Sequence, residues 1–548
     1  MKRYITVLTT LLLAGQVGWA QQPEGEDEGL PGQNITVVSE IKPILADAKK
    51  IGLNPELPPV DDRQIEVEYD VPTRMLKVPY VAPEVRPLAT RPDKVEPLKN
   101  VYAKVGFGNY LTPYLDLYVN SGRSSKYDNR DNETNLAARV NYISSNGPLP
   151  DQQFSDLRTK VMGDFFINNF ALHAFGGYDR NAIRFYGYDP EVDTIISTQD
   201  NGQTYNFIYG GLRFNNTEET YYDLEYDGTF RVNYLTDRLS QNEINPVADF
   251  MIGKRYDDNL AKIRLGVDHT TFTSDTLRQN LTIISARPSY RVQKDIWFAD
   301  IGINVGADED GFYLFPDILF ERELVDELVV FHAGFTGEVL KNNYKTLSDR
   351  NPFLNQNPLL RNSRELQVKA GVRGAPIRGG SYNAQVSYSN VNFLPLFVSD
   401  SVAVNRFNTV YDTSTNILNL HVEIGYSFGE KVRVLGAVDF FSYDLKNSAR
   451  AWHMPTIKSS ILLRYQVTEK LRAEADLFFF NRMFALTPEG TENQLPGVAD
   501  INLGASYQVN ESFHVFLDVN NIAAANYQRY YNYPSLGLNA IGGIKMIF

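Results

Sequence analysis

From about Asn100 to Phe548 the sequence alternates apolar and polar residues in segments separated by turn residues. The segment Leu418–Phe428 shows the pattern most clearly, with Leu, Val, Ile and aromatic residues at every second position and polar or small residues between them. A period of two places each set on its own face of a β-sheet. The sequence therefore predicts a long series of strands, each with one apolar and one polar face.

The polar faces of the predicted strands carry charges that indicate contact with water. The segments Ala261–Asp268, Leu471–Phe479 and Phe513–Asn520 carry charges of both signs on that face, which a packed core does not tolerate unpaired but a hydrated interior does. Tilted strands of about nine to eleven residues suffice to cross a bilayer. We therefore predict an all-β fold, a transmembrane antiparallel β-barrel. The side chains expected to face its lumen are Lys262, Arg264, Asp268, His421, Glu423, Arg472, Glu474, Asp476, His514 and Asp518.

The predicted connections alternate between short and long. Tight turns such as Asn168-Asn169 and Gln293-Lys294 alternate with longer links near 187–203, 233–242, 341–363, 393–414, 445–453, 484–496 and 523–535. Outer-membrane barrels have short periplasmic turns and long outside loops. The spacing predicts about 22 strands, two either way, and an even number puts both barrel ends in the periplasm. Residues 100–158 fit poorly, because the turn Asn109-Tyr110 is tight and the link 122–133 is long.

The first 97 residues differ from the barrel. Residues 1–20 are typical of a secretory signal peptide, with Lys2 and Arg3 ahead of a short apolar stretch, although an uncleaved anchor is an alternative. Residues 21–97 begin acidic and rich in Gly and Pro, include a possible short helix at Val37–Ile51, and carry recurrent prolines from Pro55 to Pro97. Proline removes backbone donors and fixes φ, so we expect an extended periplasmic tail. The barrel domain is predicted to span 98–548.

Composition excludes several classes of chemistry. The chain has no cysteine, which excludes disulfides, thiol catalysis and a lipoprotein anchor. Its formal net charge of −13 and the lack of a basic stripe argue against nucleic acid. The histidines are not at metal-binding spacing, and in the one acid–His cluster, Asp268-His269-Thr270, neighbours point to opposite faces. We expect no enzyme activity, catalytic residue, metal or cofactor.

The C-terminus carries a specific local feature. Ile544, Met546 and the terminal Phe548 share one face of the last strand, with Gly543 beside them. This arrangement looks like the signal that the barrel-assembly machinery recognises, although Ile541 stands where a polar residue is usual. The expected partners are therefore this machinery, through Phe548, together with outer-membrane lipid and lipopolysaccharide.

The tail from Asp518 to Phe548 resembles the closing hairpin of TonB-dependent receptors of gram-negative bacteria. The matching positions are Asn521-Ile522, Tyr527, Tyr533-Pro534 and Gly537; Ala523 to Ala525 and Leu538 depart from the pattern. The segment Ala103–Tyr114 is similar to the start of the barrel in plugless relatives. The resemblance implies a receptor-like barrel over residues 98–548. It also implies a plug before the barrel, but Gln21–Pro97 is too short for one, so inward loops, the tail or a partner must narrow the lumen.

One loop combines aromatic rings with a cation: Tyr527, Arg529, Tyr530, Tyr531 and Tyr533. Such a set could contact a sugar, peptide or lipid headgroup, or form an interfacial aromatic girdle. Two functions remain open. The first is uptake or passage of a solute across the outer membrane. The second is a structural or envelope-assembly role in which residues 21–97 bind partners.

Overall fold

The computed structural model describes residues 99–122, 124–125, 132–189, 201–218, 220 and 222–548. The predicted signal peptide, the helix at Val37–Ile51 and the tail 21–97 lie outside these residues. No helix in the described ranges is long and apolar enough to span a membrane.

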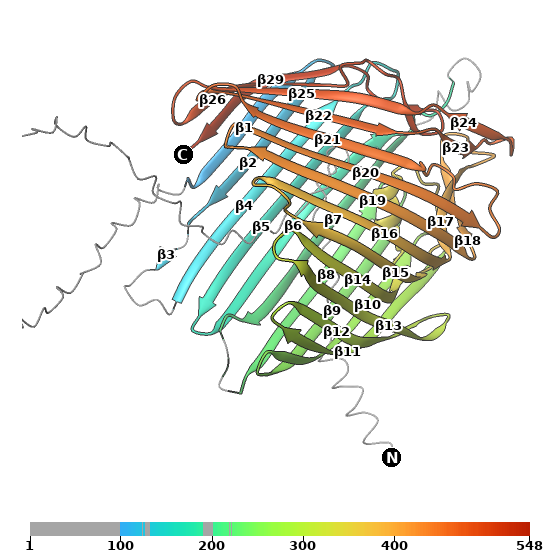
Figure 1. Cartoon of the computed structure of the whole chain (residues 1–548). Helices are drawn as coiled ribbons and strands as arrows, with labels where there is room; N and C mark the ends of the chain where they lie inside the picture. The colour runs from blue at the N-terminus through green and yellow to red at the C-terminus, as the bar shows by residue number, and fades with distance from the viewer. Residues whose placement is uncertain (1–98, 123, 126–131, 190–200, 219, 221) are drawn as a thin grey trace, which may run out of the picture. The chain divides into compact units, whose positions relative to one another are not determined.

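Twenty-two antiparallel strands close into a barrel (Figure 1). The ring is closed by β1 and β29, which pair from Tyr102↔Ile547 to Gly108↔Ile541. The strand number and the all-β class are thus as predicted. In ring order the strands are β1 (Val101–Gly108), β2 (Thr112–Asn120), β4 (Asn132–Ser145), β5 (Phe154–Ile167), β6 (Phe170–Arg184), β7 (Gly202–Asn216), β8 (Leu224–Asp237), β9 (Asn242–Tyr256), β10 (Asn259–Thr273), β11 (Arg278–Lys294), β12 (Trp297–Asp308), β13 (Gly311–Val325), β14 (Val329–Leu340), β15 (Ser363–Gly374), β16 (Gly380–Asn392), β19 (Thr415–Phe428), β20 (Val432–Leu445), β21 (Ile457–Gln466), β22 (Leu471–Phe480), β25 (Val498–Gln508), β26 (Phe513–Asn520) and β29 (Asn539–Ile547).

The two faces of the wall differ as the alternation predicts. On β19 the outward side chains of Leu420 and Ile424 are 45% and 60% exposed, whereas His421 between them is hydrogen-bonded on the other face. Arg287 of β11 meets Glu338 of β14 at 2.9 Å across two intervening strands, which identifies this polar face as the concave, inner one. A closed barrel with an apolar outer band satisfies its backbone internally and suits a bilayer.

The connections segregate to the two ends of the barrel. We call the end where β1 begins and β29 finishes the terminal rim, and the opposite end the loop rim. All the longest links lie at the loop rim: 185–201, 341–362, 393–414, 446–456, 481–497 and 521–538. This confirms the predicted alternation and places both barrel ends on one side. The short turn 109–111 at the loop rim and the link 121–131 at the terminal rim are the exceptions the sequence indicated.

Two predicted connections were wrong in detail. The turn after β11 is Asp295-Ile296, because Gln293 and Lys294 still pair with β12. The link expected at 233–242 is only residues 238–241, because β8 pairs with β9 as far as Thr236↔Asn242. In both cases backbone pairing with the next strand extends β11 and β8 past the polar residues that suggested a turn.

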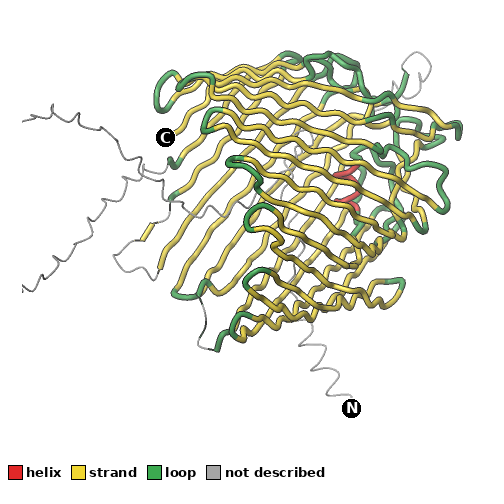
Figure 2. Tube along the Cα trace, in the orientation of Figure 1, coloured by secondary structure: helices red, strands yellow, loops and turns green. Residues whose placement is uncertain are grey.

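The longest loops carry structure of their own (Figure 2). The link 341–362 contains the helix α3 (Tyr344–Arg350), capped by the Asn343 side chain, which accepts from the Thr346 N–H at 3.0 Å. Three other long links each contain a hairpin: β17 (Leu394–Ser399) with β18 (Phe407–Asp412), β23 (Met483–Leu486) with β24 (Glu492–Leu495), and β27 (Gln528–Tyr530) with β28 (Tyr533–Pro534). Four of the long links thus contain secondary structure of their own.

The C-terminal residue helps to hold the closing seam. The Phe548 N–H donates to the Val101 carbonyl at 2.9 Å, and its C-terminal carboxylate accepts from the Asn100 backbone N–H at 2.6 Å. Gly543 in β29 lies so close to β1 that an added Cβ would stand 2.0 Å from the Val105 carbonyl oxygen. The tight seam therefore requires glycine at that position.

Candidate functional site

The inner wall is lined by ion pairs between neighbouring strands. Arg139 contacts Asp116 at 3.1 Å, and Arg213 contacts Asp227 at 2.8 Å. The two arginines keep 44% and 41% of their side chains exposed, against 11% and 10% for the carboxylates. The carboxylates thus sit against the wall while the guanidinium groups reach into the lumen, as expected for a hydrated interior.

The structure places the predicted lumen residues on this inner face. On β10, Asp268 contacts Lys341 at 2.5 Å, Arg264 approaches Asp249 at 3.6 Å, and Lys262 lies 3.7 Å from Asp300. Arg472, Glu474, Asp476, His514 and Asp518 share the inner face of β22 and β26. Asp518 pairs with Lys104 of β1 at 2.6 Å, across the seam strand β29. Lys262, Arg264, Asp268 and Asp518 are thus paired with opposite charges on other strands or at their ends.

The histidines of the wall show bonding that fits a structural role. His421 lies between Asp439, 2.9 Å from its Nδ1, and Glu423, 3.8 Å from its Nε2. His269 points away from Asp268 and bonds Thr282 through Nδ1 at 2.9 Å. No group of three metal-ligating side chains is placed to hold an ion within the described ranges.

The loop rim is filled by an apolar cluster that we call the mouth core. Its members are Tyr205, Leu235, Phe272, Leu281, Tyr344, Leu347, Leu354, Leu360, Phe397, Phe407, Tyr530 and Tyr533, all buried. Four of them come from the inner faces of β7, β8, β10 and β11, and the rest come from the long loops. The loops therefore fold inward onto the wall.

Three of these loops are rooted at nearly equal intervals around the ring. They follow the fifth, thirteenth and twenty-first strands, which are β6, β14 and β26. Their aromatic rings meet: Tyr533 stacks on Phe353 at 3.6 Å and meets Tyr186 edge-on at 4.8 Å. Because Tyr186 lies only two residues past β6, the loops that follow β14 and β26 reach inward across the mouth to the wall at that strand.

Polar contacts fix α3 against the wall. The Tyr344 hydroxyl donates to Asp237 at 2.7 Å, and its backbone N–H donates to Glu243 at 2.6 Å. Burial raises the pKa of Tyr344 well above its ordinary value, so the hydroxyl remains a donor. Gln279 of β11 donates to the Pro358 carbonyl at 2.8 Å and accepts from the Leu360 N–H at 3.1 Å. The link 341–362 is thus bonded to the wall both near its start, at Tyr344, and near its end, at Pro358 and Leu360.

His453 joins three loops in the mouth core. Its Nε2 accepts from the Tyr531 N–H at 3.3 Å, so its Nδ1 carries the proton and donates to the Phe397 carbonyl at 3.1 Å. The ring packs against Phe407 and Tyr530 at 5.4 and 5.3 Å. Burial lowers the pKa of His453 to about 4, and the neutral imidazole is therefore part of the fold.

The aromatic residues and the arginine that the sequence places together in the link 521–538 have different environments in the structure. Tyr530 and Tyr533 are buried in the mouth core and donate to the carbonyls of Arg350 and Asn405. Arg529 is exposed, Tyr531 packs against the core, and Tyr527 lies edge-on to Phe478 at 6.1 Å. A ligand role for these residues stays a prediction.

Sequence reasoning missed Tyr344, Glu243 and His453. Asn343 before a short polar run is a helix-cap signal that could have indicated α3. Nothing local indicates that Glu243 receives the start of that helix. His453 lies in a loop, where no strand alternation assigns a face.

Similar barrels are found among solved structures. The ferric-catecholate import receptor Fiu from E. coli matches with a TM-score of 0.61 and 10% identity over 82% of each chain. The FrpB iron transporter from Neisseria meningitidis matches at 0.65 and 9% identity, over 83% of this chain and 82% of that one. The siderophore receptor PirA from Acinetobacter baumannii matches at 0.62 and 8% identity, over 83% and 81%. No protein-family model and no curated protein matches the sequence. The chain therefore shares the barrel fold of these receptors and of this transporter.

Proposed function

We propose that this barrel passes a solute across the outer membrane and that its inward-folded loops form the barrier to free flow. The observation that carries the proposal is the contrast between a charged, hydrated inner wall and a mouth spanned by the mouth core. A structural scaffold needs no hydrated lumen. Barrels of 22 strands in outer-membrane transporters enclose a lumen wide enough to need a plug.

Two findings support uptake as the direction. The matched structures are named as import or siderophore receptors and an iron transporter. Long loops lie at one rim, and outer-membrane barrels direct such loops outward. A solute would then meet the mouth core first, and it would have to displace the loops to enter.

Conductance in planar bilayers tests the proposal. Leu340 and Ser363 are paired neighbours, so an Asn-Gly turn in place of residues 342–361 would close β14 onto β15 without disturbing the wall. We expect the full chain to conduct little and this variant to show large, steady currents. An equivalent Asn-Gly replacement of the terminal-rim turn 375–379 is the matched control and should conduct as little as the full chain.

A variant lacking residues 21–97 separates the barrier from the tail. Currents from this variant alone would assign the barrier to the tail. If no variant conducts, and envelope proteins co-purify with the chain through residues 21–97, transport would be contradicted and the structural role favoured.

A further inference from the structure

The barrel wall has a notch at the loop rim. Strand β20 pairs with β21 as far as Phe440↔Ile457, and the Phe441 N–H then donates to Thr456 at 2.7 Å. β20 continues to Leu445, where β19 still pairs with it but β21 does not. The far side of the notch is formed by the residues that follow β22. Asn481 ties its base together, because its side chain accepts from the Thr456 and Ile457 N–H groups at 3.0 and 3.1 Å.

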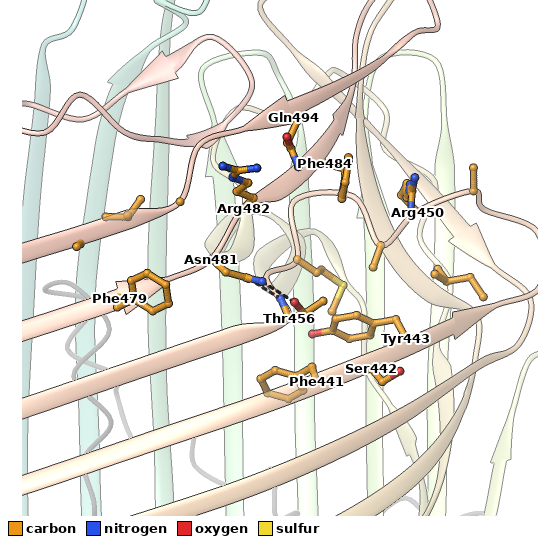
Figure 3. A pocket seen from close by; sticks show the side chains of 17 residues that line it. Phe441, Ser442, Tyr443, Arg450, Thr456, Phe479, Asn481, Arg482, Phe484 and Gln494 are labelled. Atoms are coloured by element: carbon orange, nitrogen blue, oxygen red, sulfur yellow. Dashed lines mark hydrogen bonds between the residues drawn. The ribbon is translucent and has the colours of Figure 1, made fainter.

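A cavity of about 900 Å³ fills this notch (Figure 3). Successive residues of a strand point to opposite faces, yet Phe441, Ser442 and Tyr443 all line the cavity. Phe441 and Tyr443 share the inner face of β20 with Asp439, which contacts His421, whereas Ser442 points to the outer face, so residues of both faces border the cavity at this unpaired strand edge. On its outer side it is lined by Phe479 and Ala499, which belong to the apolar outward face of β22 and β25.

The lining combines apolar surface with positive charge. Phe441, Tyr443, Met454 and Phe484 are among its apolar lining residues, and Phe441 and Tyr443 are stacked at 5.9 Å. Arg450 and Arg482 are its charged members, and the lining contains no carboxylate although the chain has a net charge of −13. Figure 3 shows both arginines above Phe441 and Tyr443.

The two arginines differ in their partners. Arg450 lies over the Phe484 ring at 4.5 Å and contacts Glu492 at 3.2 Å, so its charge is partly neutralised. Arg482 is exposed, and no carboxylate pairs with it in the described part of the chain. An anion in the cavity would therefore be held chiefly by Arg482.

We propose that this notch binds a lipid whose headgroup carries phosphate, drawn from the leaflet around the loop rim. Phe479 and Ala499 border the cavity on the apolar outward face of the wall, which gives an acyl chain an entry from the lipid side. Its size falls within the range of about 300–1,000 Å³ typical of small-molecule sites. The arginines at its rim match a phosphate in charge, and guanidinium groups bind phosphate in bidentate fashion. The site does not include the ion pairs of Arg139 and Arg213 on which the proposed function rests.

Native mass spectrometry of the full chain in detergent tests the site, with dimyristoyl phosphatidic acid as the probe and dimyristoyl phosphatidylcholine as the reference lipid. We expect one phosphatidic acid to bind more tightly than phosphatidylcholine. Ala449→Trp should fill the cavity and abolish this binding. Arg482→Ser should weaken the binding of phosphatidic acid by about fivefold and leave the binding of phosphatidylcholine unchanged, since a surface cation contributes about 1 kcal/mol to the binding of an anionic lipid.

Matched controls come from the terminal rim. Ala375→Trp and Arg378→Ser change exposed residues of the same types in the turn after β15 and should bind like the parent. Circular dichroism and the unfolding midpoint check that the Ala449→Trp variant retains the barrel. If that variant does not fold, the binding of phosphatidic acid and of phosphatidylcholine to Arg482→Ser decides alone. Unchanged binding in both cavity variants, equal losses in the controls, or full displacement of the lipid by inorganic phosphate would overturn the proposal.

Discussion

The inner wall and the mouth core lie in one barrel but are stabilised in opposite ways. The wall carries charges that neutralise one another between strands while the cationic ends stay in water, as Arg213 does with Asp227. The mouth core removes aromatic rings from water and fixes them with hydrogen bonds from buried hydroxyls, as at Tyr344. Exposed ion pairs contribute little to stability, whereas buried aromatic residues contribute several kcal/mol each.

The difference indicates which part can respond to a ligand. The wall is fixed by backbone hydrogen bonds between all neighbouring strands of the ring, and its side-chain pairs can change without altering the barrel. The mouth core depends on side chains from separate loops, so loss of one contact weakens the others. Changes in the mouth core should therefore have large effects and changes in the wall small ones.

The largest effect is expected from Tyr533→Ala. This side chain is 4% exposed, stacks on Phe353 and meets Tyr186, so its removal should cost about 3–5 kcal/mol of loop stability. Hydrogen exchange of the α3 amides measures the loss as faster local opening. Tyr256→Ala, at an outward residue that is 53% exposed, should leave that exchange unchanged. Equal exchange in both variants would show that the loops hold without the aromatic core.

The pH dependence of the same region should be the next largest effect. The pKa of His453 is about 4 in the fold against about 6.5 for a free histidine, so the neutral ring favours the folded loops. This stability is complete above pH 6.5 and is lost progressively as the pH falls from 6.5 toward 4, up to about 3 kcal/mol. Exchange or proteolysis of loops 393–414, 446–456 and 521–538 should accelerate over this range.

His453→Asn is the control for the pH prediction. Residue 453 has a φ of 58°, which asparagine tolerates, and the amide does not titrate. Subtracting its pH profile from that of the parent removes the contribution of the carboxylates. If the two profiles coincide, His453 is not the group that weakens the loops in acid.

The two regions also differ in how far the sequence predicts them. The wall follows from local alternation: Leu420 outside and His421 inside are evident from two adjacent residues, and the strand number follows by repetition. Tyr533 of the mouth core packs against Tyr186 and Phe353, and the three residues are far apart in the chain and have no common period. The sequence indicated that inward loops could narrow the lumen, but not which aromatic rings would meet. Burial of Tyr530 and Tyr533 depends on loops rooted elsewhere on the ring.

Tyr344→Phe should have an intermediate effect. It keeps the ring against Phe272 but removes the hydroxyl that donates to Asp237. Gln203 and Gln241 still donate to the same carboxylate at 2.8 and 3.0 Å, so the loss should be near the lower limit for a charged hydrogen bond, about 1.5 kcal/mol. Exchange of the α3 amides measures it. A loss as large as that from Tyr533→Ala would mean that the hydroxyl, and not the ring, anchors the helix.

The smallest effect is expected from Lys104→Met in the wall. Lys104 contacts Asp518 at 2.6 Å across the closing seam, but both side chains keep part of their surface in water, 20% and 34%. Such pairs contribute about 0–1 kcal/mol, and the seam retains its backbone pairing from Tyr102↔Ile547 to Gly108↔Ile541. The denaturant midpoint of the barrel in detergent should therefore change little, and the α3 amides should exchange as in the parent. A loss of several kcal/mol would mean that this ion pair, and not the ladder, closes the barrel, and the contrast between wall and mouth core would fail.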